Sequence, residues 1–256
     1  MGSREAPNRG DNDAATAASA VVEASELSKS FGDVEVLSEL SFSIPDDAVT
    51  AIIGPNGSGK TTLAELVTGV ESPTAGELAL HAEGERPVGY LPQDPRFQPS
   101  ATVRETVAFY AALLTSETDV DAALARVGLE AAADRRTDAL SGGMRRLLGI
   151  AVSLLGAPDL VVLDEPTSGL DPEMTRHVYD VIAGLTERDQ AVVLTTHDLS
   201  RAADADYILV MSDGNIVSAG SPAAVLADTE TETLEDAFET AVSGRTVTSA
   251  GGGNRE

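Results

Sequence analysis

A glycine-rich segment at residues 54–61 carries the residue types needed to hold a chain of phosphates. Its sequence, GPNGSGKT, fits the spacing G-x-x-x-x-G-K-[ST]. Glycines let backbone N–H groups turn inward around phosphates, and a helix that starts here adds favourable partial charge. Lys60 offers a compact cation for the β- and γ-phosphates, and Thr61 offers a hydroxyl to Mg²⁺. The segment predicts a triphosphate site made by Gly54, Pro55, Asn56, Gly57, Ser58, Gly59, Lys60, Thr61 and the following Thr62.

A second element places two acids directly after an apolar run. Residues 160–165 read LVVLDE, the pattern of a buried strand that delivers carboxylates to the carboxyl edge of a parallel sheet, where ligands bind. Asp164 is expected to hold Mg²⁺ directly or through water, and Glu165 to act as general base or to orient the attacking water. A strand that simply ends in an acidic turn has the same pattern, so this interpretation depends on the phosphate loop.

A third element, residues 140–144, reads LSGGM. Ser141 can cap a helix, and the apolar positions 144, 147, 148, 151, 154 and 155 would share one face of it. The free N–H groups at such a helix start can bind an anion. Taken alone, an ordinary Ser-Gly-Gly helix start would explain the segment equally well.

In their order along the chain, these elements resemble the motifs of the ATP-binding cassettes of ABC transporters. Four of the five residues at 140–144 match the family signature L-S-G-G-Q. The resemblance implies that Ser141, Gly142 and Gly143 contact the γ-phosphate of an ATP held by a second cassette. It covers about residues 21–242.

Five further residues occupy positions that the resemblance assigns to ATP. Gln93 resembles the Q-loop glutamine, which contacts Mg²⁺ or the attacking water, and His197 resembles the switch histidine on the γ-phosphate. Asp171 lies in a segment similar to the D-loop, which crosses the dimer. Phe31 occupies the position of the aromatic residue that stacks on adenine, with Val36 beside it.

Some residues depart from the family pattern. Met144 stands where the family usually has Gln, which predicts a weaker polar contact across the dimer, and the charge of Arg145 and Arg146 could compensate. Phe31 replaces the more common Tyr and keeps the ring for stacking. His81 and His177 match no motif and are predicted to be surface residues.

Four continuous apolar runs predict the strands of a parallel sheet that is covered on both faces. They span residues 49–53, 160–163, 191–194 and 207–211. Helical stretches are predicted at residues 61–68 and 174–186. Residues 34–44 have apolar side chains at positions 34, 36, 40, 42 and 44, and this alternation predicts an antiparallel flank.

Residues 100–157 differ, because they contain helical patterns and no strand candidate. Thr102 and Glu105 form a possible capping box for a helix that runs through Leu114, and Gly128 is expected to end a second helix that begins near Asp119. The predicted fold is therefore α/β, with a mostly parallel sheet core, an antiparallel β flank and an inserted α-helical subdomain at about 100–157. The resemblance implies that this fold is a P-loop NTPase of the ABC cassette type. Residues 1–20 are predicted to form a disordered leader, 21–242 the ABC ATPase domain and 243–256 a flexible tail.

Composition limits the partners and the location. The 256 residues carry a net charge of −25 and a pI near 4.2, so the surface should repel nucleic acid. This composition resembles that of halophilic-type acidic proteins, whose carboxylates stay hydrated in a salt-rich cytoplasm. No apolar run approaches the roughly 20 residues of a membrane-spanning helix, and no secretory signal is recognisable. A cytoplasmic protein is expected, peripheral on the inner face of the membrane.

The resemblance implies an ATP-hydrolysing subunit that uses ATP and Mg²⁺, pairs with a second cassette as a homodimer or heterodimer, and drives a separate membrane permease. Residues 233–238, TLEDAF, resemble the endings of cassettes that serve exporters. A soluble ABC ATPase of iron–sulphur cluster assembly, or of another non-transport role, is the alternative. DNA-maintenance ATPases are disfavoured, because only about 80 residues separate Lys60 from Ser141 and they show no coiled-coil heptads.

Overall fold

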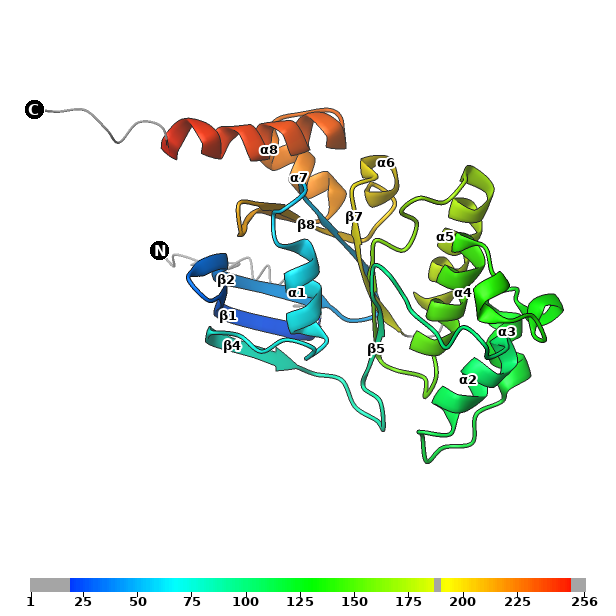
Figure 1. The fold of residues 1–256 in the computed structure, drawn as a ribbon. Coiled ribbons are helices and arrows are strands. Elements are labelled where there is room, and N and C mark those ends of the chain that lie inside the picture. The colour runs from blue at the N-terminus through cyan, green and yellow to red at the C-terminus, as the bar shows by residue number, and fades with distance from the viewer. Residues whose placement is uncertain (1–18, 187–189, 250–256) are drawn as a thin grey trace, which may run out of the picture.

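The computed structural model describes residues 19–186 and 190–249, which form two sheets and the helices around them (Figure 1). The larger sheet has six strands in the order β5-β6-β7-β3-β8-β9, and the first five of these run parallel. Only β9 is antiparallel to its neighbour β8. The six strands are β3 (Val49–Ile53), β5 (Val88–Leu91), β6 (Leu160–Asp164), β7 (Ala191–Thr196), β8 (Tyr207–Ser212) and β9 (Asn215–Gly220).

The central strands are apolar throughout because both faces of this sheet are covered. Ile52 belongs to a hydrophobic cluster shared with helix α1 (Lys60–Val67) and the second sheet. Its neighbours Ala51 and Ile53 belong to the cluster on the opposite face, which includes residues from helices α4 (Gly142–Ser153) and α5 (Pro172–Thr186). The parallel sheet core predicted from the apolar runs is thus confirmed.

The second sheet is the antiparallel flank, with the strand order β2-β1-β4. Its strands are β1 (Ala20–Phe31), β2 (Val34–Pro45) and β4 (Ala75–Leu80). At the start of β2 the buried positions do not follow the predicted alternation, because Val34 is 64% exposed and Leu37 is fully buried. Register shifts between β1 and β2, with a positive φ of 49° at Glu39, change which residues face inward.

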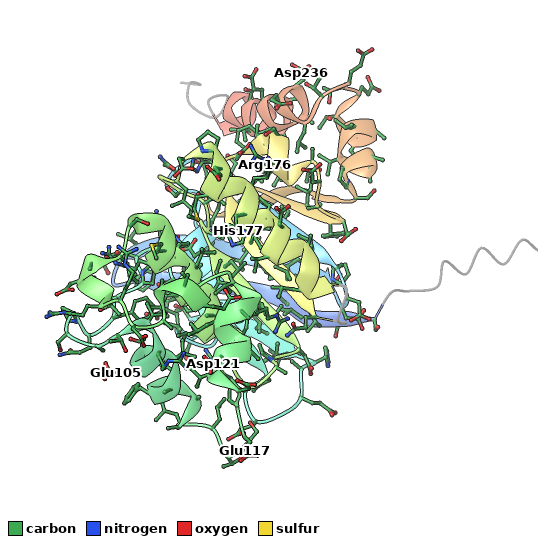
Figure 2. The ribbon with its side chains drawn as sticks, turned by 90° about the vertical axis from the view of Figure 1, so that its right-hand side faces the viewer. Glu105, Glu117, Asp121, Arg176, His177 and Asp236 are labelled. Carbon is green, nitrogen blue, oxygen red and sulfur yellow. The ribbon has the colours of Figure 1, made fainter. Side chains whose placement is uncertain are left out.

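Helices occupy residues 100–157, all of which the structure describes and none of which lies in a strand. The helices are α2 (Val103–Ala111), α3 (Val120–Arg126) and α4 (Gly142–Ser153), with 3₁₀ turns at Glu130–Ala132 and Thr137–Ala139. Thr102 and Glu105 form the expected capping box, although α2 ends at Ala111, before Leu114. Figure 2 shows Glu105, Glu117 and Asp121 on this helical region.

His177 connects the helical region to the rest of the fold. It lies on α5 (Pro172–Thr186; Figure 2), where its Nε2 is 3.1 Å from the carbonyl oxygen of Val127. The next residue, Gly128, has a φ of +71°, and a Cβ there would lie 3.1 Å from the same Nε2. The prediction that His177 is a surface residue is therefore wrong, since its ring is half-buried against the helical region. His81 has a side chain that is 52% exposed, as expected.

The C-terminal part adds α6 (Leu199–Ala202), α7 (Pro222–Thr229) and α8 (Leu234–Ser249). Helix α8 extends beyond residue 242, where the sequence suggested that the domain ends, and residues 250–256 of the predicted tail lie outside the described residues. The predicted leader, residues 1–20, also lies outside them except for its last two residues, and β1 begins at Ala20. Among the described residues, no helix has the length and apolar character needed to cross a bilayer.

Candidate functional site

The phosphate loop joins the end of β3 to the start of α1, as the sequence predicted. Two of its glycines are required by the local geometry. Gly59 precedes the helix with a φ of +100°, in the left-handed region that residues with a Cβ rarely adopt. Gly54 lies so close to β8 that a Cβ would be 2.6 Å from the backbone oxygen of Met211. Gly59 and Gly54 therefore allow the loop to turn into the helix and to pack closely against β8.

The Lys60 side chain lies inside the loop rather than in solvent. Its Nζ donates hydrogen bonds to the backbone oxygens of Gly54 at 2.8 Å and Pro55 at 3.0 Å, and the residue is only 8% exposed. Burial holds the pKa of Lys60 below its ordinary value, and the nearby carboxylates of Glu165 and Asp164 offset part of this effect. These carbonyl and carboxylate groups favour the ammonium form, which is the form that attracts phosphate oxygens.

Asp164 is a buried carboxylate with one oxygen left free for a ligand. It ends β6 with 1% exposure, and its Oδ1 accepts a hydrogen bond of 2.5 Å from the Thr195 hydroxyl on β7. Its Oδ2 is buried without a hydrogen-bond partner among the described residues. A buried unpaired carboxylate oxygen is costly, and it is a suitable ligand for a hard divalent cation, which takes oxygen donors. This donor fits Mg²⁺, even though the described residues contain no cluster of three or more His, Cys, Asp or Glu side chains.

Glu165 and His197 form a pair beside this carboxylate. Glu165 has a φ of +48° and is 8% exposed, and its N–H donates to the Thr195 hydroxyl oxygen at 2.8 Å. Its Oε2 is 2.9 Å from His197 Nδ1, and the His197 side chain is 64% exposed. Thr195 thus holds both acids, and the strained backbone turns the Glu165 carboxylate toward the histidine at the edge of the sheet.

Two adjoining cavities bring most of the predicted site residues together. Asn56, Gln93 and Glu165 line both of them. The larger cavity, of about 430 Å³, is also lined by Gly54, Pro55, Ser168, His197, Leu199 and Phe238. The smaller cavity, of about 270 Å³, is also lined by Val36, Gly57, Gly59, Lys60, Thr61 and Thr62.

The signature residues lie outside these cavities. Ser141 caps α4, since its hydroxyl oxygen accepts a hydrogen bond of 3.2 Å from the Met144 N–H, as predicted. Ser141 and Gly142 are exposed. Gly143 is buried, and a Cβ there would lie 2.6 Å from the Met174 side chain on α5. Within one chain these residues do not contribute to the pocket that contains Glu165.

Four other predicted residues do not line the cavities either, namely the buried Ser58 and Asp164 and the more exposed Asp171 and Phe31. Asp171 caps α5, because its Oδ1 accepts hydrogen bonds from Glu173 N at 3.0 Å and Met174 N at 2.9 Å. Phe31 ends β1 with 46% exposure, and Lys29 Nζ lies 4.7 Å from the centroid of its ring. One face of this ring therefore contacts a cation of the protein, and much of the ring is open to solvent.

Three residues that the motifs did not identify belong to the site or support it. Thr195 bonds both acids, and Phe238 of α8 lines the larger cavity. Arg146 is 8% exposed, and its Nη1 donates to the backbone oxygen of Gln93 at 2.6 Å. Its predicted role in compensating for Met144 across a dimer is therefore not supported by its position. The only sequence signal for it is a second charge, after Arg145, within an amphipathic helix.

Comparison with known proteins identifies the family. The family model described as "ABC transporter" matches residues 37–168, slightly more than half of the chain. The chain is 32% identical to the Nod factor export ATP-binding protein I of Rhizobium etli over 215 residues, covering 78% of this chain and 68% of that protein. It is 35% identical to the Bradyrhizobium diazoefficiens protein of the same name, covering 77% and 69%.

Solved structures agree with this result. The cbiO1 subunit of Clostridium perfringens, part of the ABC transporter complex cbiONQ, superposes with a TM-score of 0.71 at 29% identity, covering 82% of this chain and 92% of that one. An ATP-binding subunit of another ABC transporter shares the fold, with a TM-score of 0.77 over 86% and 99% of the chains, at 22% identity. The predicted fold and family are confirmed: the chain belongs to the ABC transporter family, as an ATP-binding cassette that hydrolyses ATP.

Proposed function

We propose that this chain is the ATPase subunit of an ABC exporter and that it powers transport through a separate membrane permease. The proposed ATP hydrolysis rests on one observation, the hydrogen-bonded network of Asp164, Thr195, Glu165 and His197. This network lies at the carboxyl edge of the sheet, beside the cavities that Lys60 and the phosphate loop line. It combines a cation for phosphates, a free buried carboxylate oxygen and a carboxylate–imidazole pair. This is the set of groups that phosphoryl transfer to water requires.

ATP binding is assigned to the smaller cavity and its rim. The N–H groups of the phosphate loop and Lys60 Nζ bind the β- and γ-phosphates, and the ammonium exchanges its two loop carbonyls for phosphate oxygens. Val36 lines this cavity and Phe31 is exposed, so these two side chains provide an apolar surface and a ring for adenine.

Mg²⁺ would be held by Asp164 through its free oxygen, by the Thr61 hydroxyl and by the Gln93 side chain. Of these, Thr61 and Gln93 line the smaller cavity, and Asp164 supplies the only carboxylate of the set. When bound, the cation neutralises negative charge on the β- and γ-phosphates, which favours their cleavage.

Hydrolysis is assigned to residues of the larger cavity. Glu165 accepts the proton of the attacking water or orients that water, and the Thr195 bond keeps its backbone in place. His197, whose ring is mostly exposed and 2.9 Å from Glu165, is positioned to donate to the γ-phosphate while it holds the carboxylate. Gln93 adjoins both the phosphate position and the water position, since it lines both cavities.

A second cassette completes each site. Ser141 and Gly142 are exposed and lie outside the chain's own cavities, so the N-terminus of α4, with Gly143, is available to bind the γ-phosphate of an ATP held by the partner. Asp171 keeps the adjoining loop in shape by capping α5. The proposed active form is therefore a dimer of cassettes with two ATP molecules between them.

The relatives support the export role. The proteins that match over most of the chain are named as ATP-binding proteins of Nod factor export, and cbiO1 belongs to a transporter complex. These names favour a transporter subunit over the alternative in iron–sulphur cluster assembly. In this proposal the permease selects the transported molecule, and the chain acts at the inner face of the membrane.

The test compares Glu165→Gln and Lys60→Ala with an exposed control, Glu77→Gln on β4. With MgATP, Glu165→Gln should bind nucleotide, hydrolyse it at least about a hundredfold more slowly and elute as an ATP-dependent dimer in size-exclusion chromatography. Lys60→Ala should lose ATP affinity, and Glu77→Gln should behave as wild type. Near-normal turnover by Glu165→Gln would remove it from the role of base, and tight ATP binding by Lys60→Ala would contradict the phosphate assignment.

A further inference from the structure

Arg146 is a buried cation on α4 that contacts the backbone of the loop containing Gln93. Its Nη1 donates to the Gln93 carbonyl oxygen at 2.6 Å and lies 3.4 Å from that of Pro92, and the residue is 8% exposed. Both contacts are to backbone rather than to a carboxylate. Withdrawing a guanidinium from water for two carbonyl contacts is unfavourable, so its position needs a reason other than stability.

The electrostatic surroundings of Arg146 belong to the ATP site. Burial lowers the pKa of its guanidinium, and the carboxylates of Asp164, Asp94 and Glu165 act in the opposite direction and favour the cation. Two of these acids are the residues assigned to Mg²⁺ and to water. The guanidinium is therefore placed within the field of the catalytic carboxylates, although the residue lies on the helix that begins at Ser141.

The same face of α4 contacts the loop at a second point. Gly149, one turn after Arg146, is so close to the loop that a Cβ would lie 2.4 Å from Leu91 Cδ1 and 3.4 Å from Pro95 Cβ. Residues 91–95 are thus held against α4 by a hydrogen bond at one level and by close packing at the next. A displacement of α4 along its axis would be transmitted to the Gln93 backbone through Arg146.

We propose that Arg146 is a positioning residue that couples the two ATP sites of the dimer. This inference rests on the proposed function, in which Ser141 at the start of α4 binds the ATP of the partner and Gln93 contacts the ATP of its own chain. Arg146 connects Ser141 with Gln93, because it lies on the helix that Ser141 begins and donates a hydrogen bond to the backbone of Gln93. An ATP clamped in one site then sets the position of Gln93 in the other, which is a coupling between sites.

The experiment uses Arg146→Met, with Arg104→Met as the matched control. Methionine keeps most of the buried volume and removes both contacts to the loop. Arg104 is a half-buried arginine of α2 whose Nη1 pairs with Asp121 at 2.6 Å, and it lines neither cavity of the ATP site. Steady-state hydrolysis is measured against ATP concentration for the full-length chain, together with ATP affinity and thermal stability.

Wild type and Arg104→Met should hydrolyse ATP with a Hill coefficient above one. Arg146→Met should show a coefficient of about one and a kcat about tenfold lower, the loss expected for one hydrogen bond from a charged group, with ATP affinity unchanged. A purely structural role would lower stability without removing cooperativity. If Arg146→Met does not fold, Arg146→Gln, which keeps an amide donor without the charge, is expected to show the same loss of cooperativity.

The outcomes separate the two proposals. A wild type that neither binds nor hydrolyses ATP refutes the proposed function, and the coupling with it. A wild type that hydrolyses ATP without cooperativity refutes the coupling alone. An Arg146 variant that hydrolyses ATP with the cooperativity of wild type also refutes it, whatever its kcat.

Discussion

Thr195→Val tests whether Asp164 and Glu165, the acids proposed to hold Mg²⁺ and the attacking water, depend on one hydroxyl. Thr195 lies on β7, fully buried, where its hydroxyl accepts from Glu165 N–H at 2.8 Å and donates to Asp164 Oδ1 at 2.5 Å. Valine has the same shape and the same β-branched preference for strands. The substitution therefore removes two hydrogen bonds and leaves the packing unchanged.

The expected cost follows from the two partners that lose their bond. A hydrogen bond to a charged group contributes about 1.5–3 kcal/mol, and a buried N–H left unpaired costs about 1–3 kcal/mol. Allowing for relaxation, we expect Thr195→Val to lower the free energy of unfolding by about 3 kcal/mol. With an m-value of about 3 kcal/mol/M, the urea midpoint should fall by about 1 M. The kcat should also fall, because Glu165 loses the contact that fixes its strained backbone.

Thr50→Val on the adjacent strand β3 is the matched control. Thr50 is also fully buried, and its hydroxyl has no hydrogen-bond partner among the described residues. Thr50→Val should leave the free energy of unfolding unchanged or raise it by about 1 kcal/mol, because it removes a buried unpaired hydroxyl. Urea unfolding of both variants, followed by circular dichroism at fixed salt, makes the comparison. Midpoints that agree within about 0.2 M would refute the network as described.

Two further predictions address packing and charge. Gly89→Ala should destabilise the fold by about 3 kcal/mol, because a Cβ would lie 2.0 Å from the Ser153 backbone oxygen. Gly184→Ala, in open space on α5, should stabilise the fold by about 0.5–1 kcal/mol. Equal midpoints of the two variants in thermal unfolding would contradict these predictions. Burial, followed by Glu71 and Asp164, raises the pKa of Glu65. A raised carboxyl pKa destabilises the folded state above that pKa, and this penalty is lost as the pH falls through it. Glu65→Gln should therefore be more stable than wild type at pH 7 and equally stable near pH 4. A difference in stability that persists at pH 4 would contradict the assignment.

The sequence predicted the parts of the fold whose local pattern is determined by burial. The apolar runs at 49–53, 160–163, 191–194 and 207–211 agree with β3, β6, β7 and β8 to within two residues at either end, because strands covered on both faces are apolar at every position. Strands β1, β4, β5 and β9 were not identified. Strand β1 mixes buried and exposed positions, β5 is four residues long, and β4 and β9 are edge strands without a fully buried position. The phase of β2 was wrong because a register shift leaves no local signal.

The residues of the candidate site also differ in whether a local sequence pattern identifies them. Lys60, Asp164, Glu165 and His197 could be predicted because the fold demands their residue types at fixed places, next to a strand end or a helix start. Thr195 contacts Asp164 across 31 positions of sequence, and Arg146 contacts Gln93 across 53. Neither contact has a local pattern, since each depends on which strands and helices are neighbours in space. The missed residues are those that support the motif residues rather than belong to a motif.

The two lysines of the chain show how residue type follows from this geometry. The chain has 17 basic residues, and only Lys29 and Lys60 are lysines. Each is 8% exposed, and Lys60 donates to the backbone oxygens of two residues of the phosphate loop. Lys29 donates to the Glu71 carboxylate at 2.6 Å and to the Ser72 backbone oxygen at 2.8 Å. A planar guanidinium presents donors in a fixed fork, whereas an ammonium is compact and directs its protons freely. Lys60 thus places a compact cation inside the phosphate loop, whereas Arg146, which is also 8% exposed, uses its longer planar guanidinium to reach the backbone oxygen of Gln93.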